Sequence, residues 1–141
     1  MVLRVGSLKL KAQLFCADER ALGPGRIDLL ESIDAHGSIS AAGRALGMSY
    51  RYTWLMVDSM NRCFAEKLVE TSPGGGRGGG TVLSDFGRRA LIAYRELEAS
   101  LERTARDHPR LAELEAMLRP RPLPQGGGAA QPEGAGGGAE D

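Results

Sequence analysis

The sequence predicts an α+β domain that is mainly helical, and three observations predict it. Two short segments with apolar residues at helical spacing meet at a glycine turn within residues 38–63. Two short β-prone segments flank a glycine-rich stretch over residues 67–84. A long amphipathic segment with a near-heptad pattern then begins at Ser84 or Asp85.

Length and composition allow one folded domain with extensions. The chain has 141 residues, of which 42% are hydrophobic, enough for a modest core. We expect residues 1–84 to form this domain, residues 85–119 to form linking or dimerising helices, and the Gly/Pro/Ala-rich residues 120–141 to be disordered. No N-terminal apolar run is long enough for a signal peptide or a membrane span, so we expect a cytoplasmic protein with no membrane partner.

The N-terminal part is predicted to be a β-hairpin followed by a helix. Residues 8–14 alternate apolar and polar side chains, which is typical of a half-buried strand. A hairpin over residues 8–22 with its tip at residues 18–20 accounts for this pattern. Residues 26–35 then carry apolar side chains at helical spacing, and the helix is expected to end at residues 36–37.

Residues 38–63 are predicted to be two helices joined by a tight turn. The first covers residues 38–46, and Gly47 supplies the positive φ that the chain needs just past a helix end. Ser49 is a good N-cap for the second helix, over residues 50–63. This arrangement is a helix-turn-helix, and the hairpin that follows it makes it a winged one.

The second helix is expected to have a core face and an outer face. One stripe contains Trp54, Val57, Asn61 and Phe64, with Thr53 and Met60 at its margin, and is predicted to face the core. The other stripe contains Arg51, Tyr52, Leu55, Ser59 and Arg62. Met56 is also expected to be exposed. The free N–H groups and the positive dipole end of the helix near Arg51 favour binding of a phosphate backbone, so this helix is predicted to recognise DNA.

The predicted contacts with double-stranded DNA come from both helices and the wing. Serine and arginine side chains are assigned to phosphates, Arg51 to a guanine, and the tyrosines to sugars or thymine methyl groups. Arg77 stands alone among glycines at the wing tip, where it contacts the DNA backbone or enters a minor groove; the alternative is that it contacts nothing. The predicted DNA-binding residues are Ser38, Ser40, Arg44, Ser49, Tyr50, Arg51, Tyr52, Thr53, Arg62 and Arg77.

The long helix after the wing is predicted to join two copies of the chain. Its apolar positions recur at intervals of three and four residues as far as Thr104, and Pro109 interrupts it. The residues assigned to the dimer seam are Tyr94, Leu97, Leu101 and Thr104. The alternative is that this helix and the amphipathic piece after Pro109 fold back on their own monomer.

Charge and motif content argue against an enzyme. The net charge is zero, but residues 36–95 carry eight Arg and Lys against four acidic residues, which suits DNA and also suits an ordinary polar surface. The glycine tract lacks the Lys of a phosphate-binding loop. His36 and His108 have no Ser or Cys nucleophile beside them, and Cys16 and Cys63 lack metal-binding spacing. We therefore expect no catalytic residue, no metal and two reduced thiols.

A family resemblance agrees with this interpretation. The stretch GPGRIDLLESIDAHGSISAAGRALGMSYRYTWLMVDSMNR, the glycine-rich wing and LSDFGRRALIAYRELE resemble the DNA-binding domain of the ModE family of molybdenum-responsive regulators, which is related to the LysR-type winged helix-turn-helix. The resemblance covers about residues 8–101. Its most specific parts are GSIS-AA-ALGMSY, the tryptophan of the second helix and the MN pair.

The resemblance implies a cytoplasmic, dimeric transcription regulator of molybdate-transport or molybdenum-related genes. In the family, the molybdate-binding domain forms a second half, which we do not find in this sequence, so no cofactor is expected and a response to molybdate would need a separate molybdate-binding protein. Regulation by the amount of the protein is the other possibility. The alternative to DNA binding is a winged-helix module that docks on another protein, and exposed Leu55 and Met56 would favour it.

Overall fold

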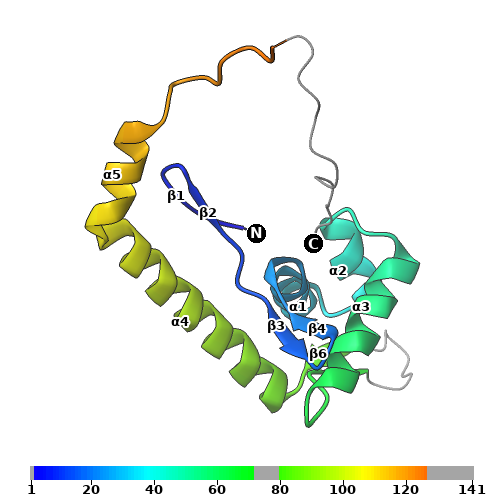
Figure 1. Cartoon of the computed structure of the whole chain (residues 1–141). Coiled ribbons are helices and arrows are strands. Elements are labelled where there is room, and N and C mark those ends of the chain that lie inside the picture. Colours follow the sequence, from blue (N-terminus) through cyan, green and yellow to red (C-terminus); the bar gives the residue numbers. More distant parts are fainter. Residues whose placement is uncertain (1, 72–79, 127–141) are drawn as a thin grey trace.

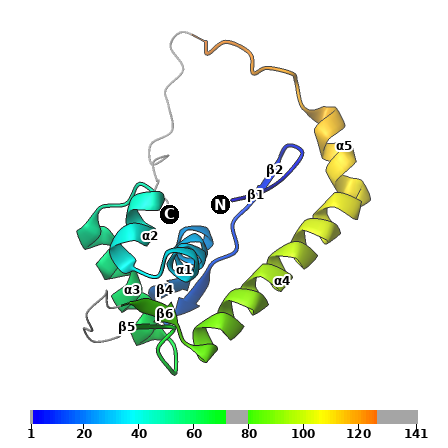
Figure 2. The same cartoon turned by 180° about the vertical axis from the view of Figure 1, so that it is seen from behind.

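The computed structural model describes residues 2–71 and 80–126. These form a mainly helical α+β fold with three small antiparallel sheets of two strands each (Figures 1 and 2). In chain order the elements are β1 Leu3–Val5, β2 Leu8–Leu10, β3 Leu14–Cys16, β4 Glu19–Leu22, α1 Pro24–His36, α2 Ile39–Ala45, α3 Tyr50–Cys63, β5 Val69–Thr71, β6 Thr81–Leu83, α4 Asp85–Asp107 and α5 Pro109–Met117.

The helix boundaries follow local capping chemistry. The Ser38 side chain accepts a hydrogen bond from the Ala41 N–H, and Ser49 accepts one from the Tyr52 N–H, so each serine caps the helix that follows it. Gly37 and Gly47 have φ angles of 72° and 73°, a region that favours glycine. The predicted helix-turn-helix is therefore confirmed. The first helix begins earlier than expected, because Pro24 takes a first-turn position, where the N–H it lacks has no helical partner.

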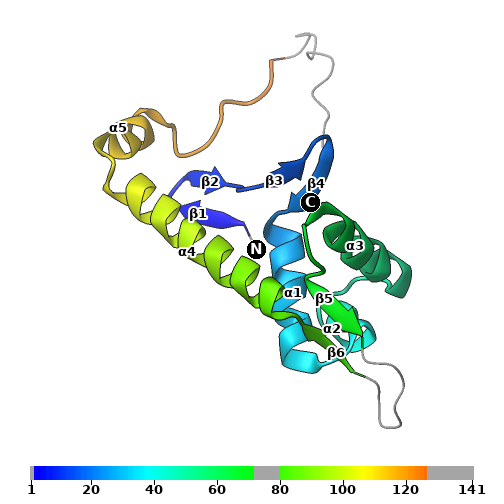
Figure 3. The same cartoon turned by 90° about the horizontal axis from the view of Figure 1, so that it is seen from below.

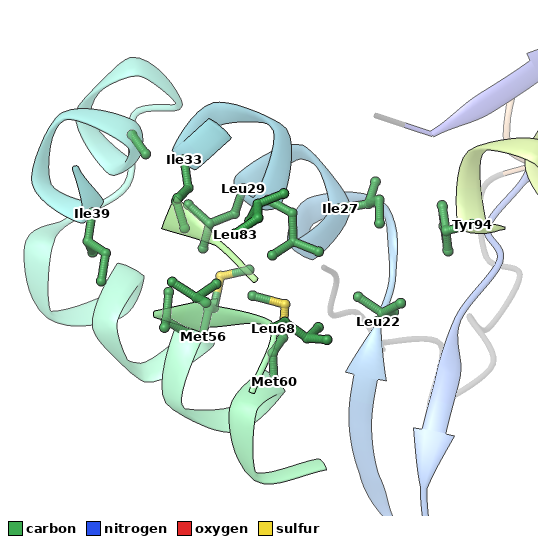
Figure 4. Packing of buried hydrophobic residues seen from close by; sticks show 14 residues of the cluster. Leu22, Ile27, Leu29, Ile33, Ile39, Met56, Met60, Leu68, Leu83 and Tyr94 are labelled. Atoms are coloured by element: carbon green, nitrogen blue, oxygen red, sulfur yellow. The ribbon is translucent and has the colours of Figure 1, made fainter. Parts of the chain in front are cut away.

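The core lies between α1, α3 and the β5–β6 hairpin. Leu29 and Ile33 of α1 point toward Met56 and Met60 of α3 in Figure 4. Leu68 and Leu83, from the two sides of the hairpin, lie in the same cluster (Figure 4). Burial of each such side chain contributes about 1.5–3 kcal/mol, so this cluster positions α3 on the rest of the domain.

Asn61 ties the end of α3 to the β5–β6 hairpin. Its Nδ2 donates to the Val69 carbonyl at 3.1 Å, and its Oδ1 accepts from the N–H groups of Leu68 and Val69 at 2.9 and 3.1 Å. Val69 pairs with Leu83 across the hairpin, and the Thr81 N–H donates to the Gly37 carbonyl at 2.9 Å. The hairpin directly after α3 has the position of a wing.

The N-terminal part differs from the single hairpin expected over residues 8–22. Two hairpins occur: β2 pairs with β1, and β3 pairs with β4. Gly6, with a φ of 58°, allows the first turn, and Ala17, with a φ of 53°, lies in the second. The expected strand at residues 8–14 is thus divided, because its first half pairs with residues that precede it.

Helix α4 crosses the back of the domain and then extends beyond it. Figure 3 shows β1 and β2 alongside α4, with α5 at its far end. Ser84 caps α4 by accepting from the Gly87 N–H. Tyr94 is buried and its hydroxyl donates to the Ala12 carbonyl at 2.7 Å. The assignment of Tyr94 to the dimer seam is therefore wrong, because this side chain fills the space between α4 and the N-terminal segment of its own chain.

The far end of the chain is held by few contacts. The Ser7 N–H donates to a Glu115 carboxylate oxygen at 2.7 Å, which ties α5 to the β1–β2 turn. Residues 120–126 form no helix or strand, and the remainder of the predicted disordered tail lies outside the described residues. No helix within residues 2–71 and 80–126 has the length and apolar character needed to span a membrane.

Candidate nucleic-acid interface

The first two turns of α3 present a large exposed surface, here called the outer face. It consists of Tyr50, Arg51, Tyr52, Trp54 and Leu55, all exposed. Ser49 caps the helix just before this surface. The free N–H groups of a first helical turn and its positive dipole end lie close to Arg51, so this end of α3 suits a polyanion.

Arg51 combines exposure with freedom from ion pairs. Among the residues that the structure describes, no carboxylate forms a salt bridge with its guanidinium. Five N–H donors therefore remain available on a side chain at the first turn of the helix. An exposed guanidinium is the group that makes bidentate contacts with guanine in the major groove.

Thr53 does not belong to the outer face. It is fully buried, and its Oγ1 donates to the Ser49 carbonyl at 2.7 Å. A Cβ built on Gly43 would lie 2.2 Å from this oxygen, so α2 and α3 cross with Thr53 packed directly against Gly43. The assignment of Thr53 to DNA is wrong, because the helix crossing encloses it.

The buried stripe of α3 also differs from the expected one. Thr53, Met56, Val57 and Met60 are buried, whereas Trp54 is exposed. Thr53 is the residue of α3 that meets Gly43 at the crossing with α2, and Trp54, the next residue, lies outside this contact. The expectations that Trp54 lies in the core and that Met56 is exposed are both wrong.

Trp54 and Tyr50 form an aromatic wall on the outer face. Their ring centroids lie 6.2 Å apart with an interplanar angle of 69°, an edge-to-face arrangement. A hollow of about 660 Å³ is lined by these two residues with Arg51, Leu55 and Asp58. It offers one guanidinium, one carboxylate and an apolar floor, which are groups that can contact base edges and thymine methyl groups.

Helix α2 presents a second polar surface beside α3. Arg44 is exposed, and its Nη1 donates to the Ser40 hydroxyl at 3.0 Å. Ser38 is half-buried and its hydroxyl oxygen caps α2. Ser38, Ser40 and Arg44 therefore lie on one short helix, but only the Arg44 guanidinium extends well into solvent.

A polar cluster at the other end of α3 involves Arg62. Its guanidinium forms salt bridges with Glu19 and Asp58, both at 2.9 Å. Glu19 also accepts from the Ser59 hydroxyl at 2.8 Å, and Arg26 donates to that hydroxyl at 2.8 Å. Ser59, expected on the outer face, is instead buried in this cluster.

The cluster shifts both ionisable partners toward their charged forms. Hydrogen bonds from Arg62 and Ser59 lower the pKa of Glu19, and hydrogen bonds to Asp58 and Glu19 raise the pKa of Arg62. Arg62 is already neutralised by two carboxylates, so a DNA phosphate would have to compete with both. Arg77, the predicted wing contact, lies outside the described residues.

The predicted dimer-seam residues separate into two groups. Tyr94 is buried in its own chain, whereas Leu97, Leu101 and Thr104 are exposed. Leu101 and Thr104 line an apolar hollow of about 350 Å³ with Leu8 and Leu10 of β2 and with residues of α5. Within the described residues, no group of three or more His, Cys, Asp or Glu side chains could hold a metal ion.

Comparison with known proteins identifies relatives of this sequence, although no family model matches it. The chain is 46% identical over 78 residues to the molybdenum transport protein ModE of Azotobacter vinelandii, covering 55% of this chain and 29% of that protein. It is 40% identical over 101 residues to the DNA-binding transcriptional dual regulator ModE of Escherichia coli K12, covering 72% of this chain and 36% of that protein. The molybdenum-pterin-binding protein MopB of Rhodobacter capsulatus is 42% identical over 80 residues, or 57% of this chain and 30% of that protein.

The similarity concerns one part of each relative, since the chain spans about a third of their length. A solved structure of the full-length LysR-type regulator LysG from Corynebacterium glutamicum is also similar, with a TM-score of 0.47, 22% identity, and coverage of 69% of this chain and 30% of that one. That likeness is too low to support a conclusion. The sequence identities and the winged helix-turn-helix described above agree: the helix-turn-helix part of this chain is similar in sequence to part of the ModE proteins.

Proposed function

We propose that the chain is a sequence-specific DNA-binding regulator of transcription that acts as a homodimer on molybdate-transport or other molybdenum-related genes. The observation that carries this proposal is the outer face of α3, where an exposed Arg51, without an ion pair among residues 2–71 and 80–126, follows a serine-capped helix start. Relatives named as transcriptional regulators and as molybdenum proteins support the choice of genes. We expect no enzymatic activity, and we expect the protein to act in the cytoplasm.

Recognition would use the first two turns of α3 in a major groove. Arg51 would donate two hydrogen bonds to a guanine, while Trp54 and Leu55 would contact thymine methyl groups. Arg44 and Ser40 of α2, with Ser49 at the cap, would contact phosphates and fix the register. Tyr50 and Tyr52 would pack against sugars or bases at the rim of the same face.

Dimerisation would use the exposed stripe of α4. This stripe contains Leu97, Leu101 and Thr104. Leu97 is 48% exposed. A second copy would cover these apolar groups and place two α3 helices on one face of DNA. Half-sites about one helical turn apart, roughly 34 Å, or a multiple of it, would fit such a dimer.

The proposal makes molybdate an indirect effector. A separate molybdate-binding protein would have to associate with the regulator, or control would follow the amount of the regulator itself. Adding molybdate to the purified chain is expected to leave DNA binding unchanged.

The test is fluorescence anisotropy on DNA from upstream of the protein's own gene and of nearby molybdate-transport genes, at two salt concentrations. We expect selective binding that weakens steeply as salt rises, because bound phosphates release counterions. Arg51→Ala should cost about 1–3 kcal/mol and relax the preference at one base position. Arg103→Ala, a change at an exposed position of α4, is the matched control and should leave affinity nearly unchanged.

A second candidate function is a protein-docking module. The aromatic and apolar character of the outer face, together with the neutralised Arg62, favours this alternative. Binding to a protein through apolar contacts would respond little to salt. If no DNA is preferred at low salt and Arg51→Ala has no effect on any DNA, the regulator proposal fails and this alternative replaces it.

A further inference from the structure

The two cysteines have no role in the proposed DNA contacts, yet the fold brings them together. Cys16 is the last residue of β3 and Cys63 is the last residue of α3. Both thiols are free. Cys16 is exposed, whereas Cys63 is half-buried.

Glu19 shows how the fold places the two thiols on either side of one carboxylate. Cys16 lies directly opposite Glu19 in the β3–β4 pairing. Glu19 in turn binds Ser59 and Arg62 of α3. Ser59 and Cys63 are four residues apart and therefore share a face of the helix. Cys16 and Cys63 therefore both lie next to the Glu19 side chain, one on the hairpin and one on α3.

The two sulfurs lie in different environments, so Cys16 is expected to react with an oxidant first and Cys63 to react second. Burial and the negative charge of Glu19 raise the pKa of Cys63, so this group stays a thiol at neutral pH. Cys16 is the exposed partner and meets a dissolved oxidant first. An accessible cysteine beside a second thiol is the arrangement in which a first oxidation product is resolved as a disulfide.

We propose that Cys16 and Cys63 form a dithiol site that a hydroperoxide converts reversibly into a disulfide between the β3–β4 hairpin and the end of α3. The Cys16 thiolate attacks one peroxide oxygen and the O–O bond breaks, giving a sulfenic acid on Cys16 and, from hydrogen peroxide, one water. The Cys63 sulfur then attacks the Cys16 sulfur, the S–O bond breaks, and a second water leaves with the Cys63 proton. The two thiols lose two electrons and two protons in total, and the peroxide is reduced.

The position of this bridge gives it a structural consequence. The ring closed between residues 16 and 63 contains β4, α1, α2 and α3, which is the whole helix-turn-helix. Closing so long a loop restricts the unfolded chain much more than the native one, where both residues already lie beside Glu19. Oxidation is therefore expected to raise the Tm by about 10 °C.

The experiment treats the reduced, purified chain with hydrogen peroxide and follows three quantities. We expect an intact mass lower by two hydrogens, a peptide that joins Cys16 to Cys63 in a non-reducing digest, and the higher Tm. Dithiothreitol should reverse all three. A non-reducing gel should show single chains, because the bridge is internal.

Single-cysteine variants make the proposal falsifiable. Cys63→Ser should stop at oxidised Cys16 without a gain in Tm, and Cys63→Ala repeats the measurement if the serine variant folds poorly. Cys16→Ser should form no internal bridge. The proposal is overturned if the wild-type chain yields only sulfinic acid or disulfides between chains, or if the bridged protein melts no higher than the reduced one. None of these readouts involves DNA, so failure of the regulator proposal leaves them intact.

Discussion

The helix-turn-helix unit and the far arm of the molecule are built in opposite ways. The unit, from Glu19 through Ser84, contains nearly the whole buried cluster, including Leu30 and Met60. The far arm, from Glu96 to the end of α5, contains no buried residue. Apolar residues that a single chain leaves exposed can be buried by association with another chain. The unit thus folds through its own contacts, and the arm is the region available to a second chain.

The polar contacts of the two regions differ in the same way. In the unit, Asn61 and Ser84 bridge elements distant in sequence. In the arm, the Arg106–Glu102 and Arg110–Glu113 pairs join residues within one helix and lie at the surface. Such surface pairs stabilise by less than about 1 kcal/mol. The comparison therefore predicts that equivalent substitutions have very different effects in the two regions.

The largest difference in stability is expected when one leucine in each region is replaced by alanine. Leu30→Ala should lower the free energy of unfolding by about 2–5 kcal/mol, because it leaves a cavity in a fully buried site. Leu114→Ala, at a residue with 59% of its surface exposed, should change it by less than about 0.5 kcal/mol. Urea denaturation of both variants at one protein concentration measures the difference. Equal losses would show that the arm is packed in solution.

The sequence predicted the elements whose ends depend on local chemistry. Ser38 and Ser49 cap their helices, and Gly47 takes a positive φ, as their residue types indicate. These features were predictable because a cap or a left-handed turn involves neighbours only. The two N-terminal hairpins were missed because the partner of β2 is a strand before it, which the alternation of residues 8–14 does not reveal.

The second largest change in stability is expected at Tyr94, where the two regions meet. Tyr94→Phe removes the hydroxyl that donates to the Ala12 carbonyl and should cost about 1–3 kcal/mol of stability. It should leave self-association unchanged. Leu97→Ala should do the reverse, since Leu97 is exposed one turn further along α4. Denaturation and sedimentation equilibrium separate the two outcomes, and weaker association of Tyr94→Phe with intact stability would contradict the placement of this residue.

Tyr94 and Thr53 also explain which site residues the sequence could not predict. Both have types and spacings that suit an exposed face, and both are enclosed by contacts with distant segments: Ala12 in one case, Gly43 in the other. The contact between Gly43 of α2 and Thr53 determines which side of α3 is buried, and Trp54 lies outside that side. Periodicity within α3 does not contain that information, whereas the exposure of Arg51 and Tyr52 follows from either rotation of the helix.

The third effect concerns the charges that fasten α4 to α1. Arg95 forms salt bridges with Asp28, Glu31 and Glu98, and these partners raise its pKa. Arg95→Met should lower stability by about 1–2 kcal/mol, because it leaves three carboxylates without their shared cation. Arg106→Met is the matched change in the arm and should cost less than about 0.5 kcal/mol. Similar costs in urea denaturation would contradict the distinction between the two kinds of ion pair.

The smallest expected effect is a pH dependence that only the unit should show. Hydrogen bonds from Arg62 and Ser59 lower the pKa of Glu19, so its contribution to stability is present above the ordinary glutamate pKa and is lost as the pH falls through the lowered value. Glu19→Gln should therefore lower the Tm slightly at pH 7, and the gap to the wild type should close below about pH 4. Glu113→Gln, in the exposed Arg110 pair, should show no such gap at either pH. Melting curves across this range test the claim, and a gap for Glu19→Gln that widens in acid would mean that its carboxylate destabilises the fold.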